Sequence, residues 1–318
     1  MIRDMLKFVG RKIAGSNGLL RDIAGSYFRQ GKYISASCAS FFSLPLRGLL
    51  KYDIISSEDY YKELHSLLKI DSAEGFGLVR IGCDHDGGYI MLDDFPGGVA
   101  YSFGIAGDVS WDKDMAARGY DVFMYDHTID GLPEENDRFH WSKLGISDGS
   151  SRDERLKTLE ELISMNHHEG KLDMILKMDV EGAEWGFLER VKPETLSQFS
   201  QMTFEIHNMI DPYTPGSERV LNVLRKISAT HQLVHLHANN NDSYVTAGGK
   251  FFCATFEVSY ALREKYKFLG ACDSYLPLKI DMPNTNLFPE ISLGHWNDEP
   301  EFDGSIFHVP HYCIKFGN

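Results

Sequence analysis

The sequence lacks any long apolar run. No stretch of its 318 residues reaches the roughly 18 uninterrupted apolar positions that a membrane-spanning helix needs. Its five cysteines are widely spaced and form no Cys-x-x-Cys pair, which argues against a disulfide-stapled scaffold and favours a reduced, cytoplasmic protein. A Gly-x-x-x-x-Gly-Lys-Ser/Thr loop is also missing, which argues against ATP or GTP hydrolysis. The basic start has no continuous apolar core after it, so we expect no secretory leader.

Charge is distributed unevenly along the chain, whose formal net charge is −14. Residues 1–51 carry nine Lys/Arg against two acids, a net of +7, whereas the remainder carries 23 Lys/Arg against 44 Asp/Glu, a net of −21. The acidic body disfavours general nucleic-acid binding, because phosphate contacts need a basic face. Apolar residues interleave the basic ones in the first 50 positions, so this segment can lie peripherally on an anionic membrane surface. An equally plausible alternative is helices that pack on the main domain or on a second subunit of a homo-oligomer.

From about residue 76, short apolar runs alternate with amphipathic segments, a pattern that predicts an α/β fold with a doubly wound parallel sheet. We expect three parts: a basic helical appendage (1–72), the α/β domain (73–270) and an irregular, proline-rich tail or lid (271–318). The predicted strands are 77–82, 89–92, 98–103, 120–125, 138–146, 173–179, 201–207, 231–237 and 251–259. The predicted helices of the domain are 110–118, 152–165, 183–191 and 215–229.

A candidate cofactor site begins at the turn after the strand 98–103. Gly104 and Gly107 stand between this strand and the next helix, where a missing Cβ lets the backbone approach a bound cofactor. The following strand ends at Asp126, 22 positions after Gly104, where a carboxylate can accept both hydroxyls of a ribose. Asp148 follows the third strand and can reach an adenine edge. A Rossmann-like domain for a different nucleotide is the alternative interpretation.

The segment after the predicted strand 173–179 carries a cluster of acids, Lys177-Met-Asp-Val-Glu-Gly-Ala-Glu184. It resembles the Lys-x-Asp-x-Glu-Gly-x-Glu signature of the FkbM-type S-adenosylmethionine-dependent methyltransferases. The resemblance spans roughly residues 76–260 and includes Arg80-Ile-Gly-Cys-Asp-His-Asp-Gly-Gly-Tyr89, Tyr101-Ser-Phe-Gly and Tyr125-Asp-His-Thr-Ile-Asp130. It implies a class I, Rossmann-like, seven-stranded sheet that ends in an antiparallel hairpin. It also implies S-adenosyl-L-methionine as methyl donor and a hydroxyl as acceptor.

The cofactor residues that this resemblance implies include one departure. Many methyltransferases place an acid two residues before the first glycine, to bind the amino group of the cofactor, whereas this chain has Ser102. Asp108 or Asp86 is then the candidate for that contact. His127, next to Asp126, is assigned to the same site.

Side chains suited to catalysis follow two neighbouring predicted strands. Asp179 stands at the mouth of its strand and Glu181 in the turn itself, and we assign both to the reaction. Glu205 and His207 share one face of the next strand, because side chains two apart in a strand point the same way. We therefore expect Asp179, Glu205 and His207 to converge at the carboxyl ends of the sheet. Glu184 opens the next helix, and stabilising that helix terminus is its expected role.

Two chemistries remain open for this convergence. In the first, Asp179, Glu205 and His207 bind Mg²⁺ or Mn²⁺, which lowers the pKa of an acceptor hydroxyl. In the second, no metal is present and His207 or Asp179 acts as the base. His235 and His237 repeat the same spacing one strand further on, where a hydrogen-bonded structural role is the simpler interpretation.

The acceptor cannot be read from these residues. A sugar of a cell-surface polysaccharide or glycolipid, methylated at the inner face of a membrane, is the first hypothesis, and another small molecule is the alternative. Asp84 and Asp86 have the Asp-x-Asp form of metal-dependent glycosyltransferases, which gives a second hypothesis. A non-catalytic module that docks a glycan enzyme through its basic arm is the third.

Overall fold

The computed structural model describes residues 57–210, 217–303 and 305–309. The chain divides into two compact units, Met1–Tyr52 and Asp53–Asn318, and every described residue belongs to the second. The predicted basic appendage, up to residue 56, lies outside the described residues. None of the helices in the described ranges is long and apolar enough to cross a membrane.

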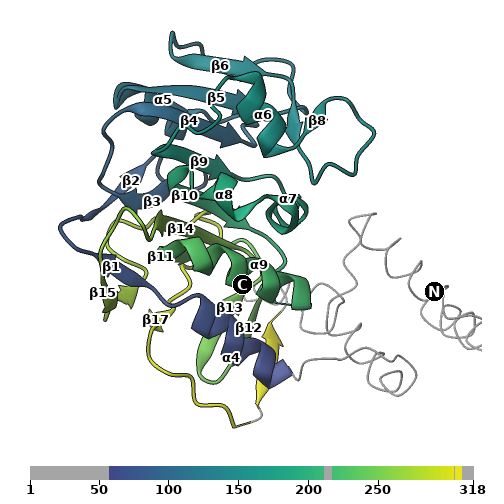
Figure 1. The fold of residues 1–318 in the computed structure, drawn as a ribbon. Coiled ribbons are helices and arrows are strands. Elements are labelled where there is room, and N and C mark those ends of the chain that lie inside the picture. The colour runs from purple at the N-terminus through teal and green to yellow at the C-terminus, as the bar shows by residue number, and fades with distance from the viewer. Residues whose placement is uncertain (1–56, 211–216, 304, 310–318) are drawn as a thin grey trace, which may run out of the picture. The chain divides into compact units, whose positions relative to one another are not determined.

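A seven-stranded, mostly parallel sheet forms the centre of the second unit (Figure 1). The strand order is β11-β14-β10-β9-β4-β5-β6. Parallel pairing joins β6, β5, β4, β9 and β10, and β14 runs antiparallel to both of its neighbours. The strands are β4 (Gly98–Phe103), β5 (Tyr120–Tyr125), β6 (Phe139–Ser142), β9 (Met174–Met178), β10 (Phe199–Ile206), β11 (His231–Ala238) and β14 (Phe256–Leu262). The prediction of an α/β fold with a largely parallel sheet is confirmed.

Both faces of this sheet are covered, as the near-continuous apolar strands require. In β4, Tyr101 and Phe103 join one buried cluster and Ala100 joins another. In β9, Leu176 joins the first cluster and Ile175 joins the second. The first cluster includes side chains of α4 (Ser57–Leu67), α6 (Leu159–Met165), α7 (Glu184–Arg190), α8 (Pro193–Leu196) and α9 (Ser217–Thr230), and the second includes α5 (Ser110–Ala117).

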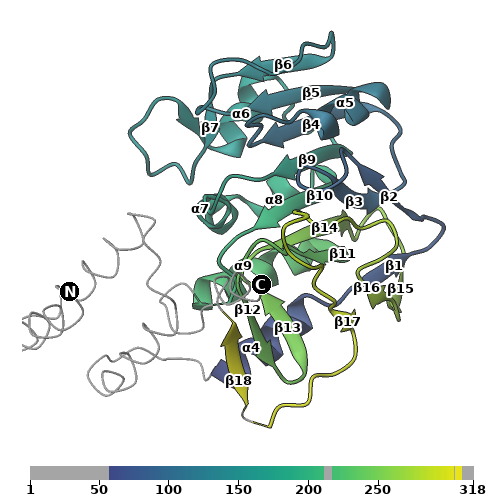
Figure 2. The same ribbon diagram turned by 180° about the vertical axis from the view of Figure 1, so that it is seen from behind.

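Short strands outside the central sheet pair among themselves (Figure 2). One antiparallel hairpin packs with α5 in the second cluster, and its loop holds the Asp84-His-Asp86 segment. The pairs are β2 (Leu78–Ile81) with β3 (Tyr89–Leu92), β1 (Asp71–Ala73) with β15 (Phe268–Ala271), β16 (Tyr275–Leu276) with β17 (Gly294–His295), and β7 (Gly145–Ile146) with β8 (Leu156–Lys157). A three-stranded sheet joins β13 (Lys250–Cys253), β12 (Tyr244–Ala247) and β18 (Ile306–Val309).

Three predicted elements differ from those observed. The strand expected over 138–146 is two strands, β6 and β7, since the amide of Leu144 turns back to the carbonyl of Ser142. The single strand expected over 251–259 is also two strands. The first, β13, ends at Cys253 and pairs with β12, whereas the second, β14, belongs to the central sheet. The helix expected over 152–165 begins only at Leu159, where Thr158 caps it through a reciprocal bond with Glu161.

Helix α4 and the tail both pack into this unit. The phenol of Tyr61 donates to the carbonyl of Ile210 at 2.7 Å, which ties α4 to the end of β10. In the tail, Trp296 is 1% exposed and its Nε1 donates to the carbonyl of Leu68 at 2.9 Å. The division of the chain at Tyr52 therefore lies before our expected boundary at residue 72, and α4 belongs with the α/β domain.

Candidate metal centre and adjoining turn

Three metal-ligating side chains meet at the carboxyl ends of two neighbouring parallel strands. Asp179 follows β9 directly, Glu205 is the penultimate residue of β10 and His207 follows it. One ligand atom from each lies within 4.8 Å of the others. Two carboxylates and an imidazole suit a divalent ion such as Mn²⁺. The structure thus brings together the three residues that the sequence places at this edge.

Glu205 shows the electrostatic character of this cluster. Its side chain is buried, and burial together with the charges of Asp179 and Glu257 raises its pKa to about 10. Asn239 holds its Oε1 by a hydrogen bond of 2.5 Å. Oδ1 of Asp179 is buried and has no hydrogen-bond partner in the described part of the chain. A bound cation would satisfy that oxygen and allow Glu205 to ionise, so the donor set fits a metal.

His207 is oriented by a second carboxylate. Its Nδ1 lies 2.7 Å from Oε1 of Glu184, which is fully buried. Burial lowers the pKa of His207, but the hydrogen bond and charge of Glu184, with Asp179 and Glu181, outweigh it and raise the pKa. If Nδ1–H donates to Glu184, Nε2 is left to bind a metal, and Nε2 faces Glu205 at 3.9 Å and Glu181 at 3.6 Å. Glu181 is largely exposed and has φ +55°, so it stands at the rim of the cluster.

Tyr89 and Lys177 line the other side of Asp179. The hydroxyl of Tyr89 is 3.5 Å from Oδ2 of Asp179, and its ring is 1% exposed. The Lys177 ammonium donates to the carbonyl of Gly104 at 2.8 Å and lies 5.9 Å from the centre of the Tyr89 ring. Burial and the charges of Asp179 and Glu257 raise the pKa of Asp86, whose loop therefore adjoins the cluster. Asp86 contributes to the acidic field of this site, although its side chain, like that of Asp84, is exposed at the surface.

Gly104 adjoins this cluster through the backbone. Its φ is +75°, and a Cβ there would meet the carbonyl oxygen of Asp179 at 1.5 Å. The glycine is thus required by the close approach of the β4 and β9 ends, whatever ligand binds. Gly107 has an ordinary φ and open space around it.

Asp126 organises the turn that follows Gly104. Its Oδ2 accepts the amides of Ile105 and Ala106, both at 3.0 Å, and its Oδ1 accepts the amide and hydroxyl of Thr128 at 2.8 and 2.6 Å. Burial raises the pKa of Asp126, but these hydrogen bonds outweigh it and lower the pKa. The Thr128 side chain is exposed, so its hydroxyl is the partner that a ribose hydroxyl can replace.

Ser102 and Asp108 both lie beside α5. Ser102 is fully buried and faces Asp112 of α5. Burial raises the pKa of Asp112, and the charge of Lys177 and the Ser102 hydroxyl offset part of that rise. Asp108 accepts the amide of Ser110 at 2.7 Å at the start of α5, and the thiol of Cys83 at 3.1 Å. Ser102 is therefore too deeply buried to contact a cofactor at the surface, whereas Asp108 is exposed.

His127 and Asp148 extend the same edge beyond Asp126. A Cβ on Gly145 would meet Nδ1 of His127 at 2.5 Å, so this imidazole packs on the start of β7. Asp148 accepts the amide and hydroxyl of Ser150, at 2.9 and 2.6 Å, and its Cβ lies close to Gly186 of α7.

His235 and His237 are hydrogen-bonded to carboxylates, in line with the structural role expected from the sequence. The sequence did not predict which residues surround the metal cluster. His237 lies between Glu257 (2.9 Å) and Glu290 (3.3 Å). Glu257 is opposite Glu205 in the β10–β14 register, and no local signal marks it. We expected Glu184 only to stabilise the start of its helix, whereas the structure also pairs it with the imidazole of His207 at 2.7 Å.

Comparison with known proteins adds little. No protein-family model matches the chain, and no curated protein matches it. A solved structure named "Putative hemolysin from Streptococcus thermophilus" aligns over 52% of this chain with 12% identity and a TM-score of 0.32. The alignment spans 58% of that protein. Similarity at this level carries no argument about function.

Proposed function

We propose that this protein is an S-adenosylmethionine-dependent O-methyltransferase that binds its hydroxyl acceptor beside a divalent cation. The observation that carries the proposal is the meeting of Asp179, Glu205 and His207 within 4.8 Å. It lies next to a glycine turn whose Gly104 carbonyl is held by Lys177. The ligand cluster and the turn share one edge of the sheet, which is where open α/β sheets bind their ligands. The reversed strand β14 and the resemblance over Lys177–Glu184 also support this reaction class.

The side chains divide the work of the transfer. Asp179, Glu205 and Nε2 of His207 would hold the cation, which lowers the pKa of a bound hydroxyl. Glu184 fixes the imidazole orientation, and Asn239 fixes Glu205. The methyl donor supplies an electrophilic methyl group, and the hydroxyl proton passes to a protein base. Glu181 is suited to take that proton because it is exposed at the rim and lies 3.6 Å from His207.

The acceptor is proposed to be a sugar hydroxyl of a cell-surface glycan. Several carboxylates surround the cluster, including Asp86 and Glu257, and carboxylates accept hydrogen bonds from vicinal hydroxyls. The basic segment 1–51 would hold the enzyme against an anionic membrane surface that carries lipid-linked glycan. Co-sedimentation of the full chain with anionic phospholipid vesicles, compared with a chain that lacks these residues, tests this last point.

Calorimetric titration with S-adenosylhomocysteine tests the reaction class. We expect binding to the full chain with Mn²⁺ present, and retention of that binding in Glu154→Gln, an exposed acid that is not a member of the cluster. Transfer of a radiolabelled methyl group to an oligosaccharide pool should require the metal and fail in Glu205→Gln. If S-adenosylhomocysteine does not bind with or without metal, and a nucleoside diphosphate binds with Mn²⁺, the methyltransferase proposal would give way to the glycosyltransferase hypothesis.

A further inference from the structure

A cavity of about 260 Å³ lies among β1, β2, β3, β11 and the tail around β16. Apolar walls come from Leu78, Leu92, Val234 and Leu278. Asp179, Glu205 and His207 are not among its lining residues, so it is distinct from the candidate metal centre. A cavity of roughly 150 Å³ is enough to hold a benzene ring. This one therefore has room for a six-membered ring and its substituents.

His235 gives the cavity a polar group that is not fully used. The side chain is 2% exposed and lines the cavity. Its Nε2 donates to the carboxylate of Asp281, 3.0 Å from Oδ1 and 3.3 Å from Oδ2. Asp281 is itself fixed by the amide of Leu278 at 2.6 Å. Nδ1 of His235 has no hydrogen-bond partner among the described residues, so it is open to a polar group of a ligand.

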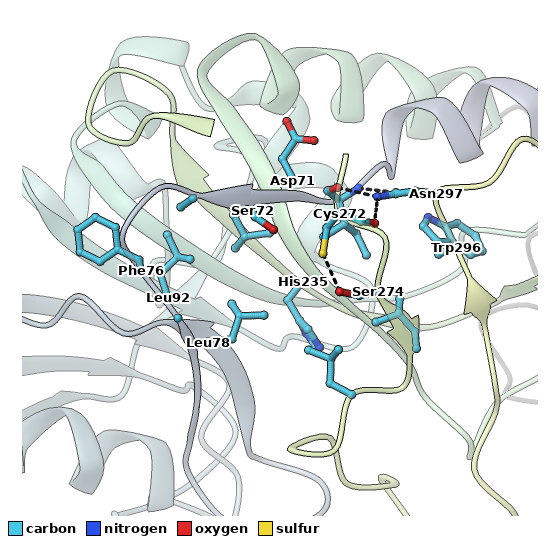
Figure 3. Close-up of a pocket in the computed structure, with 16 residues that line it drawn as sticks. Asp71, Ser72, Phe76, Leu78, Leu92, His235, Cys272, Ser274, Trp296 and Asn297 are labelled. Atoms are coloured by element: carbon cyan, nitrogen blue, oxygen red, sulfur yellow. Dashed lines mark hydrogen bonds between the residues drawn. The ribbon is translucent and has the colours of Figure 1, made fainter. Parts of the chain in front are cut away.

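Hydroxyl groups accompany this imidazole. Ser72 and Ser274 line the same cavity as His235, and Figure 3 draws all three side chains. The Ser274 hydroxyl lies 2.6 Å from the thiol of Cys272. The Asp71 carboxylate points away from His235 in the same view. The lining thus combines apolar walls with a small number of polar groups, as in pockets that orient a mostly apolar ligand.

The charge of the lining selects against anions. Among the described residues that form the walls, none is a lysine or an arginine. The Asp281 carboxylate stands directly behind His235. A negatively charged ligand would therefore lose its hydration without gaining a counter-charge.

We propose that this cavity binds a neutral, single-ring molecule whose hydroxyl forms a hydrogen bond with Nδ1 of His235. The ring lies against Leu78, Leu92 and Val234, and the serine hydroxyls provide secondary contacts. This site is independent of the proposed methyl transfer. Its occupant bridges β11 and the tail segment that carries Asp281, so it ties the tail to the domain.

Phenol and cyclohexanol are the probes for this proposal, and benzoate and toluene are their matched partners. In titrations of the full chain followed by NMR, phenol and cyclohexanol should bind saturably. Benzoate and toluene should bind at least about tenfold more weakly, because benzoate is charged and toluene has no hydroxyl group. In protein labelled with ¹⁵N at histidine, phenol should shift the imidazole resonance that is lost in His235→Asn.

Two cavity-filling variants locate the binding. Ser72→Leu and Ser274→Phe should each reduce phenol binding by at least about tenfold, whereas Ser151→Leu, at an exposed loop position, should leave it unchanged. If either serine variant fails to fold, the shift of the His235 resonance in the wild-type protein still shows whether phenol binds in this cavity. Equal binding of benzoate and phenol, or phenol binding that leaves the His235 resonance unmoved, would overturn the proposal.

Discussion

Oε1 of Glu184, at the start of α7, lies 2.7 Å from Nδ1 of His207, at the end of β10. Glu184 is fully buried, and its charge helps to raise the pKa of the imidazole. A helix terminus and a strand terminus are thereby joined around a side chain that the candidate metal centre needs in one orientation. Carboxylates that hold a ligating histidine in this way tune metal sites widely.

Replacing Glu184 should therefore weaken metal binding without removing a ligand. We expect Glu184→Gln to lower Mn²⁺ affinity by about 10–100-fold and to change its pH dependence, because the imidazole loses its charged partner. Glu189→Gln is the matched control, since Glu189 is on the same helix, is exposed and pairs with Arg219. Calorimetric titration between pH 6 and 8 provides both readouts. Unchanged affinity and pH dependence in Glu184→Gln would show that Glu184 has no positioning role.

Glu205→Gln should abolish metal binding while leaving the metal-free protein folded. The pKa of Glu205 is raised from 4.5 to about 10, so the metal-free fold binds a proton that the unfolded chain releases. The free energy of unfolding should then fall as pH rises from 4.5 to 10, and a glutamine should remove part of that fall. Thermal unfolding with Mn²⁺ and with EDTA measures both effects. Glu154→Gln should behave like the wild type, and a Mn²⁺-dependent rise in Tm that persists in Glu205→Gln would contradict the assignment.

The convergence of Asp179, Glu205 and His207 was predictable because two simple rules suffice. Neighbouring parallel strands end at the same edge, and side chains two apart in a strand share a face. The partners Asn239 and Glu257 were not predictable, since their approach depends on β14 pairing with β10 on one side and with β11 on the other. Ser102 shows a further limit. Its position before Gly104 suggests a cofactor contact, but the alternation of β4 turns it towards Asp112.

The outer strands were less predictable than the sheet for a related reason. An apolar run from 251 to 259 looks continuous in sequence, yet its first half pairs with β12 and its second half with β10 and β11. The pattern of apolar residues indicates which positions are buried but not which strand they pair with. A change from one sheet to another within an apolar run therefore leaves no signal in the periodicity.

Gly104 and Gly107 should respond oppositely to the same substitution. Gly104→Ala should destabilise the protein by at least about 3 kcal/mol, because its Cβ would overlap the Asp179 carbonyl at a positive φ. Gly107→Ala meets open space and should leave stability unchanged or raise it by about 0.4–1 kcal/mol. Urea unfolding of the two variants is the measurement. Equal tolerance at both positions would show that the ends of β4 and β9 are not in close contact.

Asp126 should prove important for folding as well as for any ligand. Asp126→Asn removes acceptors from the amides of Ile105 and Ala106 or from Thr128, and should cost about 1–3 kcal/mol of unfolding free energy. Asp130→Asn is the control, since this nearby acid is exposed and its pair with Lys143 should contribute nothing measurable. Chemical denaturation in the absence of cofactor separates this structural effect from ligand binding. Wild-type stability in Asp126→Asn would mean that the turn holds without its carboxylate.

His237 should make the stability of the protein depend on alkaline pH. Burial lowers its pKa, but hydrogen bonds to Glu257 and Glu290 outweigh this and raise the pKa from 6.5 to about 10. Its contribution is therefore complete below pH 6.5 and is lost as the pH rises through 10. At pH 6, His237→Gln should be less stable than the wild type by about 3 kcal/mol, because Glu257 loses its buried partner, and the gap should narrow towards pH 10. Urea unfolding at several pH values measures the gap, with His295→Gln as an exposed control that should show none, whereas a gap that stays constant with pH would contradict the protonated state of His237.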